Sequence, residues 1–180
     1  MRADARRNYE RIVATARDAF LTDGVDVPLD DIAKRAGVGA GTLYRHFPSR
    51  DSLVESVYRE EITQLADAAF RLRDELPPGD ALFAWMREQV RWINDSLGMA
   101  SALKSAMDSE SETYAYCKKT IRAAVGALLE PAQEAGIVRA DLQQGDLLRL
   151  THGVGAAAQY SDAEGVERML TVLIDGMRAS

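Results

Sequence analysis

The segment GVGAGTLYRHFPSRDSL, residues 37–53, gathers side chains that suit contact with a charged, hydrogen-bonding partner. It offers a hydroxyl at Thr42, a phenol at Tyr44, a guanidinium at Arg45 and an imidazole at His46. All four groups can donate hydrogen bonds to phosphate oxygens or to base edges. Small residues precede them and would let the backbone approach a partner closely; these are Gly39, Ala40 and Gly41. The segment therefore indicates a contact surface for nucleic acid.

Two short helices joined by a tight turn are expected to position this surface. The first helix is expected over residues 29–36, and Gly37 suits the position after it because a left-handed conformation costs glycine little. The second is expected over residues 40–46. Ala33 is small enough for the two helices to cross closely, and Leu43 supplies an apolar anchor. This is a helix-turn-helix geometry, and its second helix is free to enter a major groove.

The rest of the chain has the apolar periodicity of helices and almost no strand pattern, which predicts an all-α fold. Further helices are expected at residues 6–22, 49–74, 80–97, 99–107, 110–135, 142–160 and 162–178. We expect an N-terminal three-helix DNA-binding domain over residues 1–50 and a larger C-terminal helical domain over residues 51–180. The helix at 49–74 would connect the two domains.

Charge is unevenly divided along the chain. Residues 1–50 carry nine Lys and Arg against seven Asp and Glu, whereas the remainder carries 13 against 21, for a net charge of −6. An acidic body repels DNA in general, while a less acidic N-terminal part can still approach it. A chance fluctuation explains the same split equally well.

Several sequence features bear on where the protein acts. No apolar run approaches the roughly 20 residues of a membrane span, and no signal peptide is evident. The single cysteine, Cys117, forms no internal disulfide, which suits a reducing compartment. We therefore expect a cytoplasmic protein with no membrane partner.

Patterns typical of enzymes are missing from the sequence. It has no G-x-S-x-G, no phosphate-cradling glycine loop and no metal-ligand cluster, since its only imidazoles and thiol are His46, His152 and Cys117. We expect no enzymatic activity, no metal and no cofactor. A helical protein-interaction module is the remaining alternative to DNA binding, and the intact segment GTLYRHF argues against it.

The stretch LDDIAKRAGVGAGTLYRHFPSRDSLVESV resembles the N-terminal DNA-binding domain of the tetracycline-repressor (TetR) family of bacterial regulators, over about residues 8–57. The resemblance implies phosphate contacts from Tyr44, His46 and Arg50, with Leu43 and Phe47 in the core. The full set of expected DNA-binding residues is Gly39, Ala40, Gly41, Thr42, Tyr44, Arg45, His46 and Arg50.

One departure from the family pattern lies at the start of the second helix. Members often carry Ser or Thr there, whose hydroxyl caps the helix and touches a phosphate, whereas this chain has Val27 and Pro28. A backbone N–H would have to replace that contact.

The C-terminal part offers apolar and aromatic side chains for a ligand cavity, because such pockets are mostly apolar. Trp85 and Trp92 lie one heptad apart, and methionines near them suit an adaptable surface. The expected lining is Phe70, Trp85, Met86, Trp92, Met99, Leu103, Met107, Tyr114, Cys117 and Ile121. Plain core packing is the alternative for each of these side chains.

The last two expected helices combine small residues with an apolar stripe. Resemblance to the family implies that they form a four-helix bundle with a second copy of the chain. The expected interface consists of Leu147, Leu150, Gly153, Val154, Ala157, Met169, Leu170, Leu173, Ile174 and Met177. Alternatively, the stripe closes the core of the monomer. A twofold dimer would place two recognition helices on the half-sites of a pseudo-palindromic double-stranded DNA operator.

These inferences together predict a homodimeric, sequence-specific transcriptional regulator, most simply a repressor. An unknown small effector, mostly apolar or aromatic, would bind the C-terminal domain and move the helix at 49–74. The operator would then be released, provided that the effector binds the two states with different affinity.

Overall fold

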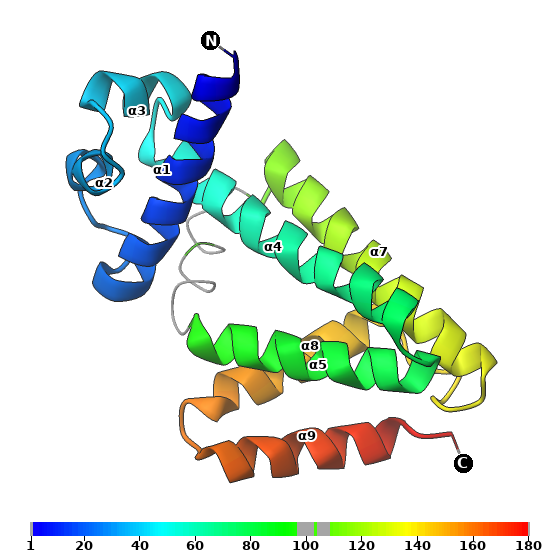
Figure 1. The fold of residues 1–180 in the computed structure, drawn as a ribbon. Helices are drawn as coiled ribbons and strands as arrows, with labels where there is room; N and C mark the ends of the chain where they lie inside the picture. Colours follow the sequence, from blue (N-terminus) through cyan, green and yellow to red (C-terminus); the bar gives the residue numbers. More distant parts are fainter. Residues whose placement is uncertain (1, 97–102, 104–108, 180) are drawn as a thin grey trace. The chain divides into compact units, whose positions relative to one another are not determined.

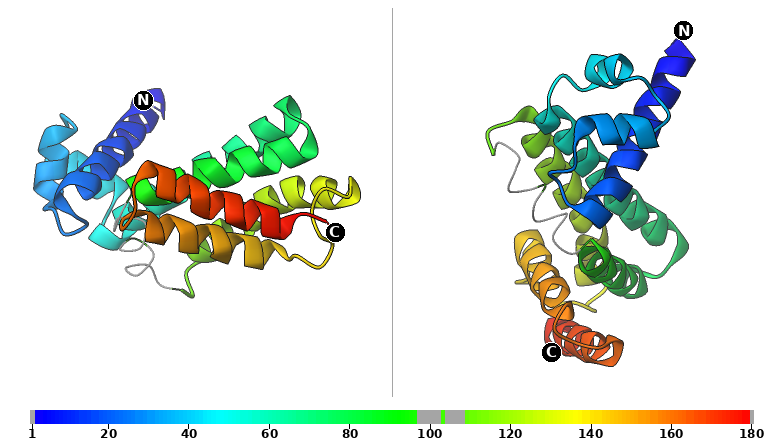
Figure 2. Two further views of the ribbon diagram at one scale, coloured as in Figure 1. Left: turned by 90° about the horizontal axis from the view of Figure 1, so that it is seen from below. Right: turned by 90° about the vertical axis from the view of Figure 1, so that its left-hand side faces the viewer.

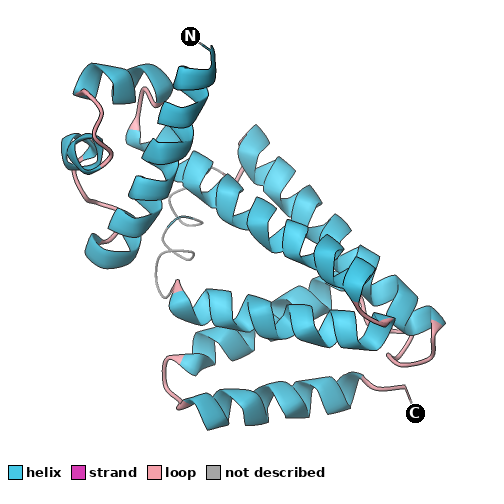
Figure 3. Cartoon of the chain, viewed as in Figure 1, coloured by secondary structure: helices cyan, strands magenta, loops and turns pink. Residues whose placement is uncertain are grey.

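The computed structural model describes residues 2–96, 103 and 109–179, and every regular element in that part of the chain is an α-helix (Figures 1 and 3). The helices are α1 (Arg2–Asp23), α2 (Leu29–Arg35), α3 (Ala40–His46), α4 (Arg50–Glu75), α5 (Pro78–Asp95), α7 (Glu112–Glu134), α8 (Gln144–Ala158) and α9 (Ala163–Met177). The predicted all-α class is therefore confirmed. The helix expected at 99–107 lies outside the described residues, apart from Leu103.

Most predicted helix ends lie within two residues of the observed ones, and α1 differs most. It begins at Arg2, where the apolar periodicity had indicated a start at residue 6. The extra turn carries no apolar stripe. Exposed side chains near this end of α1 form ion pairs one helical turn apart, Arg7 with Asp4 at 2.5 Å and Arg6 with Glu10 at 2.8 Å.

The helices form two compact units. The first contains residues 2–61, Leu103 and residues 109–115, and the second contains residues 62–96 and 116–179. The boundary that we expected after residue 50 would cut through the first core, because the opening turns of α4 bury Leu53 and Val57 there.

The first unit is built on a core to which α1, α2, α3 and the start of α4 all contribute. Ile12, Ile32, Leu43 and Phe47 are each 0% exposed. An ion pair also joins α1 to α4, because Nε of Arg17 donates to Oε1 of Glu61, a carboxylate with 1% of its side chain exposed. Packing in this core fixes the short helices α2 and α3, which would be marginal in isolation.

The second unit buries Trp85 and Met86 of α5 completely, against side chains from α4, α7, α8 and α9. The indole Nε1–H of Trp85 donates to the carbonyl oxygen of Leu65 at 2.9 Å. The indole therefore fills the core without leaving a buried donor unsatisfied. None of the described helices is long and apolar enough to cross a membrane.

Helices α5 and α8 approach each other closely at Gly155, and α9 lies beside α8 in both views of Figure 2. A Cβ atom at Gly155 would lie 2.6 Å from Cγ2 of Ile93. The sequence analysis placed Gly153 and Ala157 of this segment at a contact with a second copy. At Gly155 the small residue instead serves packing within the chain.

We expect Gly155→Ala to destabilise the protein by about 1–3 kcal/mol, because the added methyl group overpacks the α5–α8 contact. Gly153 of the same helix is the matched control, since a Cβ there meets nothing within 4 Å. Gly153→Ala should raise stability by up to about 1 kcal/mol through helix propensity. Urea unfolding followed by circular dichroism measures both changes. Equal effects from the two substitutions would contradict the close approach.

Candidate nucleic-acid interface

Helices α2 and α3 form the helix-turn-helix predicted from the sequence, and a glycine turn joins them (Figure 1). Gly37 has a φ of 63°, a left-handed conformation that favours glycine. The Gly37 N–H donates to Lys34 O at 3.1 Å, and the Val38 N–H donates to Ala33 O at 3.0 Å. These two bonds are the Schellman pattern, which satisfies the last carbonyl groups of α2 and turns the chain sharply into α3.

Helix α3 has one buried side and one exposed side. Leu43 lies in the core at 0% exposure, and Phe47 just after the helix is equally buried. The residues expected to contact DNA lie on the rest of its surface. Gly39, Ala40, Gly41, Tyr44 and Arg45 are exposed, and Thr42 and His46 are half-buried. Seven of the eight expected DNA-binding residues are therefore accessible at the surface of this segment.

Tyr44 reaches from α3 across to α2. Its side chain is 45% exposed, and its hydroxyl lies 3.5 Å from Oδ1 of Asp30. The sequence analysis missed Asp30 as a neighbour, because the two residues are 14 positions apart and meet only when α2 and α3 cross. A phosphate bound by Tyr44 would have to displace this long hydrogen bond.

The His46 imidazole packs at the other edge of α3, against an aromatic ring of α1. The ring centroids of Tyr9 and His46 are 6.2 Å apart, in an edge-to-face arrangement. Tyr9 also lies 5.2 Å from the Phe47 ring. These contacts hold the C-terminal end of α3 against α1. The sequence analysis assigned Tyr9 no role at this surface, because it lies on another helix, 37 positions before His46.

Arg45 folds back along the outer surface of its own helix. Its Nε donates to the carbonyl oxygen of Gly41 at 3.0 Å, and its Nη2 donates to the hydroxyl of Thr42 at 3.3 Å. Both partners are neutral, so neither compensates the positive charge of the guanidinium at the surface.

Arg50 has a different role from the one expected. Its Nη1 donates to the carbonyl oxygens of Val25 and Val27 at 2.6 and 2.9 Å, and the side chain is half-buried. The guanidinium therefore holds the turn that precedes α2. Sequence reasoning missed this because the two carbonyl groups become neighbours only after the chain folds. At the start of α2, Pro28 occupies the N-cap position and provides no side-chain cap, because proline has no polar side-chain atom.

Six of the ten residues expected to line a ligand pocket lie in the second unit. Trp85, Met86 and Cys117 are at most 2% exposed, and the half-buried members are Phe70, Trp92 and Ile121. Leu103 and Tyr114 instead pack in the core of the first unit, and Met99 and Met107 lie outside the described residues. Around Trp85, the structure therefore shows the packed core that we had named as the alternative.

The expected dimer residues divide into two groups. Leu147, Leu170, Ile174 and Met177 are at most 5% exposed, so they close the core of the chain and are not available to a second copy. The expectation for these four residues is therefore corrected. An apolar stripe does not by itself show whether it faces the core of its own chain or a second copy. Leu150 and Gly153 are exposed, and the half-buried members are Val154, Ala157, Met169 and Leu173.

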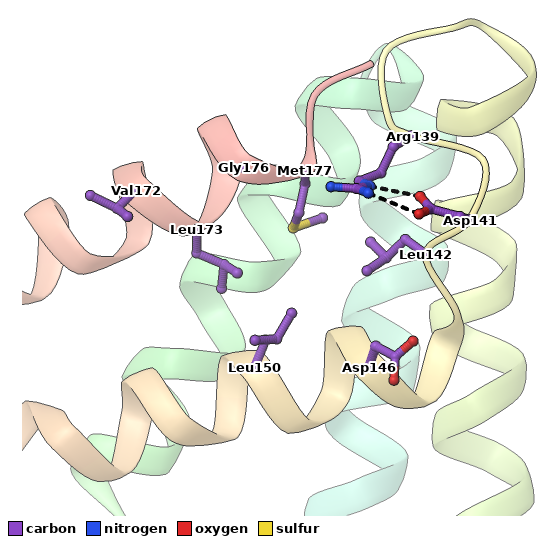
Figure 4. A pocket seen from close by; sticks show the side chains of 9 residues that line it. All are labelled: Arg139, Asp141, Leu142, Asp146, Leu150, Val172, Leu173, Gly176 and Met177. Atoms are coloured by element: carbon purple, nitrogen blue, oxygen red, sulfur yellow. Dashed lines mark hydrogen bonds and ion pairs between the residues drawn. The ribbon is translucent and has the colours of Figure 1, made fainter. Parts of the chain in front are cut away.

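A groove of about 480 Å³ lies in the second unit along α8 and α9, and Figure 4 shows the side chains that line it. Leu150, Val172 and Leu173 provide its apolar part. At one end, the Arg139 guanidinium donates to both Asp141 oxygens at 2.6 and 2.8 Å, and this hydrogen bonding lowers the pKa of the Asp141 carboxyl. The groove thus presents an apolar surface beside an exposed ion pair.

Comparison with known proteins gives matches in both units. Residues 12–57 match the family model described as bacterial regulatory proteins, tetR family. Residues 77–179 match the model described as transcriptional regulator SbtR-like, C-terminal domain. The HTH-type transcriptional regulator SAR0097 of Staphylococcus aureus is 40% identical over 67 residues, which is 36% of this chain and 35% of that protein. The chain thus matches about a third of the length of this relative.

Two solved structures are similar over nearly the whole chain. The TetR transcriptional regulator SCO0520 from Streptomyces coelicolor is 36% identical with a TM-score of 0.74, and the alignment covers 96% of this chain and 99% of that one. A TetR transcription regulatory protein from Mycobacterium vanbaalenii is 38% identical with a TM-score of 0.77, and the alignment covers 99% of each chain. The similarity therefore extends well beyond the helix-turn-helix.

Proposed function

Because the chain belongs to the tetR family of bacterial regulatory proteins and is a DNA-binding transcriptional regulator, we propose that it is a homodimeric repressor released by a small effector. Membership of this family makes it a regulator and not an enzyme. The DNA contact rests on the exposed face of α3, and the observation that carries it concerns Gly41.

Gly39 is the N-cap residue of α3, a position that suits glycine, whereas Gly41 has no role that the fold itself explains. Neither has a positive φ, and a Cβ at either position would meet nothing within 4 Å. Glycine within a helix costs about 1 kcal/mol relative to alanine, so Gly41 lowers the stability of α3 without any packing gain. Close approach of an external backbone explains Gly41, because it needs the space that a methyl group would fill. This supports DNA docking at the N-terminal end of α3.

We expect Gly41→Ala to raise the stability of the protein while weakening its binding to DNA. Helix propensity should add up to about 1 kcal/mol to the free energy of unfolding. The methyl group should lower operator affinity by about 10-fold or more, as overpacking of a close contact does. Thermal melting and fluorescence anisotropy with labelled duplex measure the two effects. A variant that is more stable and binds DNA as tightly as the wild type would contradict the proposed docking.

The proposed phosphate contacts come from Tyr44 and His46 at the two edges of α3, with Thr42 and Arg45 between them facing the bases. A backbone N–H at the start of α2 would replace the hydroxyl that Pro28 lacks. Contacts to phosphates fix the register on the duplex, whereas contacts to base edges select the sequence.

The proposed dimer uses the exposed part of α8 and α9. Leu150 is 44% exposed and Val172 is 74% exposed, which is unusual for apolar side chains of this size on adjacent helices. The apolar groove beside them offers complementary surface for the same helices of a second copy. Sedimentation velocity over a range of concentrations tests this association directly.

The proposed effector site lies in the second unit around Trp85, Met86 and Trp92. Because Trp85 and Met86 are fully buried, an effector there must bind a state in which this core is open. An effector with higher affinity for that state shifts the population toward it and, through α4, away from the DNA-binding form. We place the protein in the bacterial cytoplasm, where its operator would lie.

Selection of bound duplexes from a random library tests the function as a whole. Recovery of a palindrome supports a dimer on an operator, whereas recovery of a lone half-site contradicts the dimer. Failure to enrich any sequence contradicts operator binding. Transcription in vitro from a promoter that carries the recovered site should fall when the protein is added, and a rise would make it an activator.

A further inference from the structure

We infer that Arg45 reads a guanine in each half-site of the operator, an assignment that rests on the proposed function. Its place on α3 is the first observation. With about 100° of turn per residue, Arg45 lies about 180° from the midpoint between Leu43 and Phe47. Both of those side chains are 0% exposed, so Arg45 lies on the side of α3 opposite the core.

The neighbours of Arg45 on this exposed side of α3 have short side chains or none. Gly41 and Thr42 precede it by four and three positions, so they share its face. Tyr44 and His46 are turned to opposite edges, where they meet Asp30 and Tyr9 respectively. A partner that approaches the side of α3 opposite the core therefore meets the guanidinium before any other long side chain.

Two hydrogen bonds orient the Arg45 guanidinium. The Nε donates to Gly41 O at 3.0 Å, and Nη2 donates to Thr42 Oγ1 at 3.3 Å. A guanidinium has five N–H donors, so these bonds leave both N–H groups of Nη1 and one of Nη2. The remaining donors form a planar edge with two parallel N–H directions.

This donor edge matches one base in the major groove. Guanine presents two adjacent acceptors there, N7 and O6, which accept a bidentate pair from arginine. Adenine presents one acceptor and one donor, cytosine presents a donor, and thymine presents a single acceptor beside its methyl group. Arg45 forms no ion pair with the carboxylates of the described chain, so its charge is available to this acceptor pair. Guanine is therefore the base that Arg45 recognises.

The experiment compares sequences selected from a random library by the wild type, Arg45→Ala and Arg122→Ala. Arg122 is an exposed arginine of the second unit, so its loss controls for the change in charge. The wild type and Arg122→Ala should prefer guanine at one position of each half-site by about 10- to 100-fold. Arg45→Ala should lose that preference and keep the others. Because Arg45 is exposed, circular dichroism should show an unchanged fold.

A second measurement identifies the atom that is read. The recovered duplex is synthesised with 7-deazaguanine at that position, which removes the N7 acceptor. This change should weaken binding of the wild type by about 10-fold and leave that of Arg45→Ala unchanged. Thr42→Val should reduce the guanine preference by a smaller factor, since it removes only the orienting hydroxyl.

The possible failures are distinguishable. If the wild type enriches no sequence, the proposed function is wrong and this inference is wrong with it. If the wild type recovers a defined site and Arg45→Ala recovers the same site with the same preferences, only the inference is overturned. A uniform loss of affinity for all sequences, with a weaker dependence on salt, would assign Arg45 to a phosphate and would also overturn it.

Discussion

Leu43→Ala is expected to destabilise the first unit by about 2–5 kcal/mol and to abolish operator binding. Leu43 is fully buried and is the only fully buried side chain within the seven residues of α3. Helices this short are marginal without tertiary packing. Loss of the anchor should therefore release α3 from the core, so that its outer face no longer has a fixed orientation for DNA.

The measurement combines urea unfolding with hydrogen exchange of the α3 amides. Leu43→Met is the matched control, because a swap that conserves volume usually costs less than about 1.5 kcal/mol. It should retain both protection and binding. If Leu43→Ala lost less than about 1 kcal/mol and still bound its operator, packing by this side chain would not be what holds the recognition helix.

Trp85→Ala is expected to destabilise the second unit by about 3–5 kcal/mol, the range for removal of a buried tryptophan. The indole is 0% exposed and also donates to Leu65 O at 2.9 Å. The substitution therefore removes a large apolar volume that joins α5 to α4. The chain has two tryptophans, so the fluorescence of Trp92 reports unfolding of the variant without interference.

Trp85→Phe separates the two contributions. It keeps an aromatic ring in the core and removes the hydrogen bond, which contributes about 1 kcal/mol in typical cases. We expect its destabilisation to be less than half that of Trp85→Ala. Equal losses from the two variants would show that the volume of the indole contributes little, contrary to its complete burial.

Much of the fold and part of the interface were predictable from the sequence. The helix-turn-helix was predictable because its signals are local: Pro28 before α2, Gly37 after it, and an apolar Leu43 at the right spacing. The Schellman bonds at Gly37 confirm the turn. The outward position of Arg45 also follows from periodicity, because a residue two positions after a buried one lies on the other side of a helix.

Contacts between residues distant in sequence were not predictable in this way. Arg50 was expected at a phosphate, and it instead binds two carbonyl groups 23 and 25 positions away. Leu147 and Ile174 were expected at the contact with a second copy, and both are buried in the core of the same chain. In each case the residue type indicated a kind of contact, and the partner depended on which segments the fold brings together.

The sequence by itself determined that this chain is helical, where its turns lie and that it carries the recognition helix of a tetR-family regulator. These properties depend on backbone preferences and on apolar spacing within a few turns, which the order of residues fixes directly. Only the tertiary structure decided which apolar stripe faces inward, so that Leu147 and Ile174 are buried while Leu150 and Val172 remain exposed. Apolar spacing identifies a stripe, and only the packing of one helix against another determines which of its residues lose contact with water.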